Sequence, residues 1–496
     1  MAAVCVVAGA MGGAAPAVAR SDGAALARFY DQQPRWTRCR IAPDDEVGAQ
    51  LDRAGAQCAD VVVPLDYANP AGRTISVAIS RLPASDTAHR IGTLVIGAGG
   101  PGEPGLHMPL PTRDAMRQTG TRFDLVGVDP RFVGRSMPVD CDWPTGLFIR
   151  SPGPGRAGFD RQVAFNRHLV HASTRNTARD MDVIRAALGE RRISYLGYSA
   201  GSYLGAVYTQ LFGTRTDRVV LDSAADPRRW GLPTMLSDTA AVNERALRAF
   251  AGWAAARDAT FGLGATAAQV LTTVDRITRA AADRPLRVGD YQVEADVVPT
   301  IIWMRVGDDR DQSRAGLAGM LRVLRRAATL APAEPPVQPT PELDQVLRIL
   351  LTGEFSWLGS VLTSILCADV AAPQDPETYW RNIQRTRRSH PTFGPLLNNI
   401  SPCAFWRRAP LEAPTTVGNS TSALIVSATG DTRTTYRGAR ALHRLMTGSR
   451  LLTLRGVIAH GIYGEYGNAC VDNTVNAYLA SGHLSRTDLT CTAGNP

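Results

Sequence analysis

The stretch Ile193-Ser-Tyr-Leu-Gly-Tyr-Ser-Ala-Gly-Ser202 decides the fold of this chain of 496 residues. Its apolar start predicts a buried strand, and the apolar spacing of 202–212 predicts a helix directly after it. Two glycines flank Ser199 between the strand and the helix, as a tight turn requires. Such a turn lifts the serine hydroxyl above the edge of a sheet, so Ser199 is the candidate nucleophile.

The segments around this turn alternate between strands and helices. Apolar runs predict strands at 91–96, 123–128, 218–222, 422–427 and 450–454, and helical spacing predicts helices at 177–188, 434–446 and 468–480. This alternation favours a mostly parallel sheet with helices on both faces. Together with the G-x-S-x-G turn, it predicts an α/β-hydrolase fold.

The alternation stops near Ala225 and resumes after Pro414. The residues between are mostly helical in pattern, with a proline-rich loop at 331–339. The chain is also longer than one hydrophobic core usually allows. We therefore expect a hydrolase core at 20–224 and 415–496, with a helical cap or lid at 225–414 inserted after the sixth strand.

The N-terminus carries the pattern of an export signal. Residues 1–19 are almost all small or apolar and end in an A-x-A cleavage pattern, although no positive charge precedes them. We expect a signal peptide at 1–19, with a retained anchor as the alternative. No later segment is apolar over the roughly 20 residues of a spanning helix, which favours a secreted or cell-wall location without a membrane span.

Cysteine usage agrees with export. Of eight cysteines, Cys5 lies in the leader and Cys141 is left over, while the other six form plausible local pairs: Cys39 with Cys58, Cys367 with Cys403, and Cys470 with Cys491. Spacing alone does not prove this connectivity. The chain has no C-x-x-C pair and no histidine-rich tract, so we expect neither a metal site nor a cofactor.

A serine hydroxyl becomes a strong nucleophile when a neighbouring base removes its proton. In α/β-hydrolases the acid and then the histidine follow the serine along the chain. Four of the eight histidines follow Ser199. His390 lies in the expected cap, His443 in a predicted helix and His483 near the C-terminus, whereas His460 follows the last predicted strand. We predict His460 as the general base.

The orienting carboxylate is expected in the loop after the preceding strand. Asp431 directly follows the strand at 422–427, so it is the predicted third member of the triad. The alternative is that Asp431 caps the helix that starts near Thr434. Asp222 and Asp226, after another predicted strand, are the second choices.

The second oxyanion donor is expected in the loop after the strand at 91–96. Gly99-Gly-Pro-Gly102 exposes backbone N–H groups there, and we predict Gly100 as the donor beside the N–H of Ala200. The stretch has neither the Lys-Ser/Thr of a phosphate-binding loop nor the order of a dinucleotide fingerprint.

The net charge of +9 comes from arginine alone, because the chain contains no lysine. A nucleic-acid-binding domain gathers its cations on one face or in one tract. The densest groups here, at 322–326 and 385–388, are short and lack aromatic residues for stacking. The sequence therefore predicts no nucleic-acid partner.

Seven motifs along the chain resemble a known family. They are GGPG at 99–102, DPRFVGRS at 129–136, GYSAG at 197–201, VLDSAADP at 220–227, DTRT at 431–434, HG at 460–461 and the closing segment between Cys470 and Cys491. In this order they resemble the secreted actinobacterial tripeptidyl aminopeptidases, relatives of the prolyl aminopeptidases among the α/β-hydrolases.

The resemblance implies a serine peptidase that releases short peptides, tripeptides above all, from the free N-termini of peptides or exported proteins through an acyl-enzyme. It also implies Ser199, Asp431 and His460 as the triad. A cap motif at 365–369 makes Asp369 a candidate partner for the substrate's α-ammonium, with a solvated or salt-bridged aspartate as the alternative. Where the family's glycine-rich loop continues with glycine, this chain has Glu103, which alters the pocket wall.

Two other functions compete with a peptidase. An esterase or lipase would use the same triad, because the fold does not determine the substrate. A catalytically inactive binding protein on the same fold is the alternative of another class. The cap motif and the cysteine-containing tail favour peptides, and the presence of all three triad residues favours an enzyme.

Overall fold

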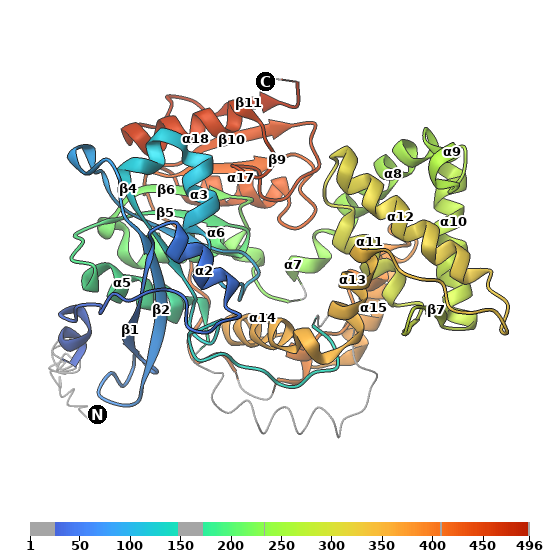
Figure 1. The fold of residues 1–496 in the computed structure, drawn as a ribbon, viewed down its shortest axis with the longest axis horizontal. Coiled ribbons are helices and arrows are strands. Elements are labelled where there is room, and N and C mark those ends of the chain that lie inside the picture. The colour runs from blue at the N-terminus through green and yellow to red at the C-terminus, as the bar shows by residue number, and fades with distance from the viewer. Residues whose placement is uncertain (1–24, 147–171, 233, 407–408, 495–496) are drawn as a thin grey trace, which may run out of the picture.

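The computed structural model describes residues 25–146, 172–232, 234–406 and 409–494, so the expected leader at 1–19 lies outside the described residues. A nine-stranded sheet forms the centre of the core domain (Figure 1). Its strand order is β1-β2-β4-β3-β5-β6-β9-β10-β11. Only β2 runs against its neighbours β1 and β4, and the other pairs are parallel. The sheet confirms the predicted α/β-hydrolase fold.

The strands are β1 (Gln57–Pro64), β2 (Thr74–Leu82), β3 (Gly92–Gly97), β4 (Phe123–Val128), β5 (Ile193–Tyr198), β6 (Thr216–Asp222), β9 (Leu424–Ala428), β10 (Arg450–Arg455) and β11 (Leu489–Thr492). The helices that cover them are α2 (Glu46–Arg53), α3 (Pro109–Met116), α5 (Thr174–Ala187), α6 (Ala200–Phe212), α17 (Tyr436–Leu445) and α18 (Ala469–Ser481).

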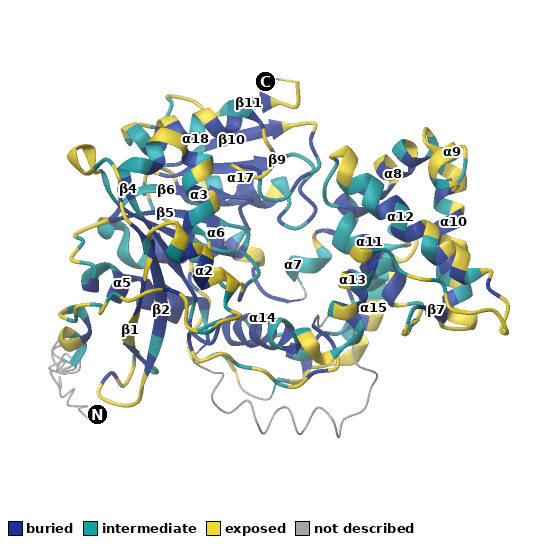
Figure 2. Ribbon diagram, in the orientation of Figure 1, coloured by how far each residue is buried: buried dark blue, intermediate teal, exposed yellow. Residues whose placement is uncertain are grey.

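Helices cover both faces of the sheet, so the central strands are buried on both sides (Figure 2). Alternate residues of β9 enter two different apolar clusters. Ile425 packs with residues of α5, α6 and α17, whereas Leu424 and Val426 pack with residues of α2, α3 and α18. This arrangement explains why the central strands read as continuous apolar runs.

Between β6 and β9 the chain forms a mostly helical cap with an apolar cluster of its own. Its helices are α7 (Thr234–Ser237), α8 (Ala240–Ala255), α9 (Asp258–Phe261), α10 (Ala267–Asp283), α11 (Val297–Arg305), α12 (Asp311–Ala328), α13 (Pro341–Leu351), α14 (Ser356–Asp369), α15 (Pro376–Thr386) and α16 (Phe393–Leu397). A hairpin of β7 (Leu286–Val288) and β8 (Tyr291–Val293), which the helical pattern did not predict, interrupts them. We propose 225 and 414 as the cap boundaries.

The structure contains the three disulfides expected from the cysteine spacing, Cys39–Cys58, Cys367–Cys403 and Cys470–Cys491. The last one ties α18 to β11, an edge strand that the sequence pattern did not predict. In the described part of the chain, no single helix is long and apolar enough to cross a membrane. The helices at 341–351 and 353–369 meet that criterion only as a pair bent by 74°.

A buried ion pair supports the loop after β4. Arg131 donates to Asp180 on α5 from Nε (2.7 Å) and Nη2 (2.5 Å), and both side chains are almost completely buried. Two residues earlier, the Asp129 carboxylate accepts hydrogen bonds from the N–H groups of Gly105 (2.7 Å) and Leu106 (3.2 Å). The loop between them therefore links α5 to the segment after the glycine-rich loop.

We expect Arg131→Met to destabilise the protein strongly, because it leaves the Asp180 carboxylate buried without its cation. Breaking such a pair from one side costs about 3–5 kcal/mol. The free energy of unfolding in urea measures the loss. The double variant Arg131→Met/Asp180→Leu removes both charges, and we expect it to recover most of the stability. A single variant as stable as the wild type would contradict this account.

Candidate active site

Ser199 occupies a strained turn between β5 and α6. Its backbone has φ 54° and ψ −118°, a conformation that non-glycine residues rarely adopt. The flanking glycines are required by close backbone contacts. A Cβ on Gly197 would lie 2.4 Å from the carbonyl oxygen of Gly201, and one on Gly201 would lie 2.5 Å from that of Gly97. The turn therefore has the geometry of a nucleophile elbow.

His460 and Asp431 form the buried polar pair of the site. The Nδ1 atom of His460 lies 2.9 and 3.0 Å from the two carboxylate oxygens of Asp431. Asp431 is fully buried, whereas a quarter of the His460 side chain is exposed. An imidazole held through Nδ1 presents Nε2 for proton transfer, as the base of a serine triad does.

The surroundings of Asp431 favour its ionised form. Burial alone would raise its pKa, but the His460 ring and the N–H groups of Arg433 (2.8 Å) and Thr434 (3.0 Å) outweigh burial and hold the pKa below its usual value. The capping alternative for Asp431 is wrong, because Thr435 is the N-cap of α17. The triad role of Asp431 stays a prediction, and the pairing of its carboxylate with His460 agrees with it.

The end of β6 anchors the loop that carries His460. The Asp222 carboxylate accepts hydrogen bonds from the N–H groups of Ile462 (2.9 Å) and Tyr463 (2.7 Å). The Ser223 hydroxyl accepts one from Gly461 N–H (2.8 Å). Burial raises the pKa of Asp222 to about 6, although the two N–H donors lower it. Asp222, the second choice for the triad acid, thus contacts the backbone of this loop.

The same residue contacts the nucleophile elbow. The backbone N–H of Ser199 donates to the carbonyl oxygen of Asp222 (3.0 Å). Among the described residues, no hydrogen bond joins the Ser199 hydroxyl to the His460 ring. Hydrogen bonds of this kind are often long without substrate. Ser199 and the His460 loop are nevertheless tied to one strand end, on the same edge of the sheet.

The glycine-rich loop lies against the elbow. A Cβ on Gly99 would lie 3.4 Å from the Ser199 Cβ. Gly100 has φ 102°, and a Cβ there would lie 2.8 Å from Gly102 N, so a larger residue would strain the loop. Ala200 is the first residue of α6, where backbone N–H groups lack partners within the helix. The oxyanion roles of Gly100 and Ala200 stay predictions.

Cap residues hold the loops of the predicted acid and base. Arg433 stacks on Trp303 of α11 at 3.9 Å and also donates to its carbonyl oxygen. Burial lowers the pKa of Arg433 to about 10, against the opposing effect of Asp431. Asp309, between α11 and α12, accepts a hydrogen bond from Ile458 N–H (2.8 Å), two residues before His460.

Asp369 ends α14 as an internal hydrogen-bond acceptor. Its oxygens accept from the Thr174 N–H (2.7 Å), the Thr174 hydroxyl (2.5 Å) and the Trp230 indole N–H (2.9 Å). Burial raises its pKa to about 6, although these donors lower it. Asp369 is buried, and no described residue forms an ion pair with it, so the structure does not show the salt-bridged form of the alternative. Its contact with a substrate ammonium stays a prediction.

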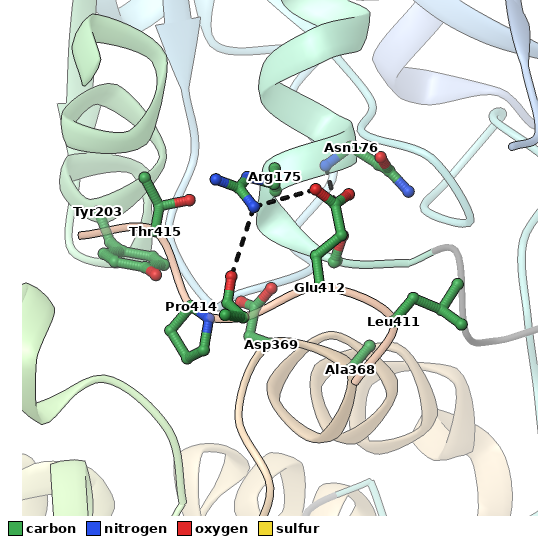
Figure 3. A pocket seen from close by; sticks show the side chains of 11 residues that line it. Arg175, Asn176, Tyr203, Ala368, Asp369, Leu411, Glu412, Pro414 and Thr415 are labelled. Atoms are coloured by element: carbon green, nitrogen blue, oxygen red, sulfur yellow. Dashed lines mark hydrogen bonds and ion pairs between the residues drawn. The ribbon is translucent and has the colours of Figure 1, made fainter. Parts of the chain in front are cut away.

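Figure 3 shows the small pocket that Asp369 lines, opposite the ion pair of Arg175 and Glu412. The pocket offers about 20 Å³, which is space for one or two waters. A much larger cleft of about 850 Å³ lies between α8 and α17; Asp431 and Thr434 are among its lining residues, whereas Ser199 and His460 are not.

Among the described residues, no group of three or more His, Cys, Asp or Glu side chains is placed to hold a metal ion. Sequence reasoning missed the role of Asp222 and Ser223 as an anchor of the His460 loop. The only signal in the sequence was the position at a strand end, which made Asp222 a second choice for the triad acid. It also missed Thr434, whose hydroxyl donates to Asp431 Oδ2 (3.0 Å).

Comparison with known proteins finds relatives along the whole chain. A family described as TAP-like protein matches residues 390–491, and the alpha/beta hydrolase fold family matches 92–271. A tripeptidyl aminopeptidase of Streptomyces lividans is 32% identical, over 98% of this chain and 94% of its own. Serine protease Hip1 of Mycobacterium tuberculosis is 29% identical over 91% and 89%, and carboxylesterase B of that species is 30% identical over 92% and 90%.

We expect Asp431→Asn to lower kcat about 10⁴-fold with little change in KM, because the amide no longer stabilises the protonated histidine or selects its tautomer. The pKa of Asp431 is lowered, so in the wild type this carboxylate stays ionised to a lower pH than an ordinary aspartate. Asp488→Asn, next to His443 at the surface, is the control. A kcat within tenfold of the wild type would argue against the assignment.

We expect Asp222→Ala to lower kcat about 100-fold by displacing the His460 loop, since small misplacements of catalytic groups have effects of this size. It also leaves two backbone N–H groups unpaired, at about 1–3 kcal/mol each in the free energy of unfolding. In Asp222→Asn the amide oxygen can still accept hydrogen bonds from the two N–H groups, so we expect partial rescue of kcat. Asp217→Ala, on the same strand but away from the site, is the control. Equal kcat in both Asp222 variants and the wild type would refute the anchor.

Proposed function

This chain belongs to the tripeptidyl aminopeptidase family of serine peptidases with the α/β-hydrolase fold, and we propose that it releases short peptides from free N-termini through Ser199, Asp431 and His460. The observation that carries the proposal is the pairing of His460 with buried Asp431 at the strand edge that also holds the Ser199 elbow.

In the proposed reaction, His460 takes the proton of the Ser199 hydroxyl as its oxygen attacks the scissile carbonyl carbon. The N–H groups of Gly100 and Ala200 bind the oxyanion of the tetrahedral intermediate. His460 then gives the proton to the leaving amine, and the short N-terminal peptide stays on Ser199 as an ester. Water, deprotonated by His460, releases this peptide and restores the serine.

The position of the cap supports a peptide as the substrate. The cap, from α7 to α16, stands beside the edge of the sheet that carries the site (Figure 1), and Trp303 and Asp309 of the cap contact the loops of Asp431 and His460. We propose peptides or exported proteins with free N-termini as substrates.

We also propose that the mature protein acts outside the cytoplasm, in the medium or at the cell wall. The leader pattern at 1–19 supports export. The three disulfides support it too, because such bonds persist in oxidising compartments.

An esterase is the second candidate, since one relative over most of the chain is named carboxylesterase B. The same triad chemistry cleaves esters, so the geometry of Ser199 and His460 does not separate the two activities. The substrate decides between them.

A panel of chromogenic substrates tests the proposal on protein lacking residues 1–19. We expect tripeptidyl anilides with a free amine to be cleaved with a higher kcat/KM than prolyl anilides or alkanoyl esters. Ser199→Ala is expected to lower kcat about a millionfold, because the nucleophile is lost. A fluorophosphonate is expected to label the wild type and not this variant.

The outcomes separate the candidates. Preference for esters over every peptide would establish the esterase. A wild type that neither turns over any substrate nor reacts with the fluorophosphonate would favour the catalytically inactive binding protein.

A further inference from the structure

Glu103 is a carboxylate beside the nucleophile that the proposed reaction does not use. It directly follows the glycine-rich loop after β3. A Cβ built on Gly99 would contact both the Ser199 Cβ (3.4 Å) and Glu103 Oε2 (3.5 Å). The carboxylate and the nucleophile are therefore separated by little more than one small side chain.

No described residue forms a hydrogen bond or ion pair with the Glu103 side chain. The residue is exposed to solvent, yet enough protein surrounds the carboxylate to raise its pKa. His460 and His107 are the titratable groups whose charge acts on it, and both oppose that rise. A cation that approaches this carboxylate would stabilise its charged form.

The cap packs on the loop that precedes Glu103. A Cβ on Gly102 would lie 2.6 Å from Val361 Cγ1 and 3.5 Å from the backbone N of Leu362, so α14 of the cap packs directly on this loop. The protein around the Glu103 carboxylate weakens its solvation, and an ion pair formed there is stronger than one in open water.

Asp369 does not offer the same opportunity. Three protein donors already occupy its oxygens, and its pocket has room for one or two waters. A carboxylate binds an ammonium group more strongly than a neutral acceptor does. Among the acidic residues discussed for the site, Glu103 alone is both exposed and without a partner.

We propose that Glu103 binds the free α-ammonium of the peptide substrate. The assignment rests on the proposed aminopeptidase function and names the group that recognises the N-terminus. An extended chain advances about 3.3–3.6 Å per residue, so a carboxylate this close to Ser199 suits an ammonium within the first few residues before the scissile bond. Blocked N-termini lack the positive charge and do not form this pair.

Glu103→Gln tests the pair with matched substrates, one tripeptidyl anilide with a free amine and the same compound acetylated. We expect kcat/KM for the free amine to fall about 10- to 100-fold, mainly through KM, as for the loss of one charged hydrogen bond. The acetylated compound is expected to change little. The ratio of the two values measures recognition of charge, which a general disturbance of the fold would leave unaltered.

Two more variants and one pH series sharpen the test. Glu103→Asp keeps the charge on a shorter side chain, and we expect partial rescue of the free-amine preference. Glu465→Gln, an exposed residue in the loop after His460, is the control and is expected to match the wild type. In the wild type, KM for the free amine is expected to rise as falling pH protonates Glu103, and because the pKa is raised, this begins at a higher pH than for an ordinary glutamate. In Glu103→Gln this dependence is expected to disappear.

A Glu103→Gln enzyme that keeps the free-amine preference, or that loses both substrates equally, would overturn the assignment. Its reaction with a fluorophosphonate, measured on the same preparation, reports whether Ser199 and His460 are intact. A wild type that cleaves no peptide refutes the proposed function together with this pair. A wild type that cleaves peptides, with an unchanged preference in the variant, refutes the pair alone.

Discussion

The geometry of the site depends on the hydrogen bonds made by Asp222 at the end of β6. Its carbonyl oxygen accepts from Ser199 N–H, and its carboxylate accepts from two N–H groups just after His460. One residue thus relates the nucleophile elbow to the loop of the predicted base. The strand order β5-β6-β9-β10 makes this possible, because the carboxyl ends of parallel strands meet at one edge. Serine, anchor, aspartate and histidine follow four adjacent strands.

The cap does more than cover this edge. Arg433 reaches from the Asp431 loop onto Trp303, and Asn243 of α8 donates to the Thr432 carbonyl oxygen (2.9 Å). Asp309 contacts the segment before His460. Residues of α14 also belong to the apolar cluster of the core domain. Movement of the cap would therefore act on the pairing of Asp431 with His460, and the two parts of the molecule are coupled through these contacts.

Local patterns carried most of what the sequence could predict. The elbow around Ser199 follows from two glycines and a strand before a helix, and the positions of His460 and Asp431 follow from the strands before them. The strands β7, β8 and β11 are each three or four residues long, which is too short for alternating apolar and polar residues to be recognised in the sequence. The hydrogen-bond partners of Asp369 could not be predicted from the sequence for another reason. Its partners Thr174 and Trp230 lie 195 and 139 residues away, so only the folded chain brings them together.

The carboxylates of the site differ in what their oxygens already bind. Asp431 has a histidine and three other donors, which favour its charge in spite of burial. The carboxylates of Asp222 and Asp369 accept hydrogen bonds from other parts of the protein, and burial raises their pKa values to about 6. Glu103 is exposed, and its backbone is outside the left-handed region that Gly100 and Gly102 occupy on the same loop. A side chain is therefore tolerated at 103 and not at Gly100 or Gly102. A charge at 103 lies at the end of the glycine-rich loop, at a position where the backbone does not require glycine.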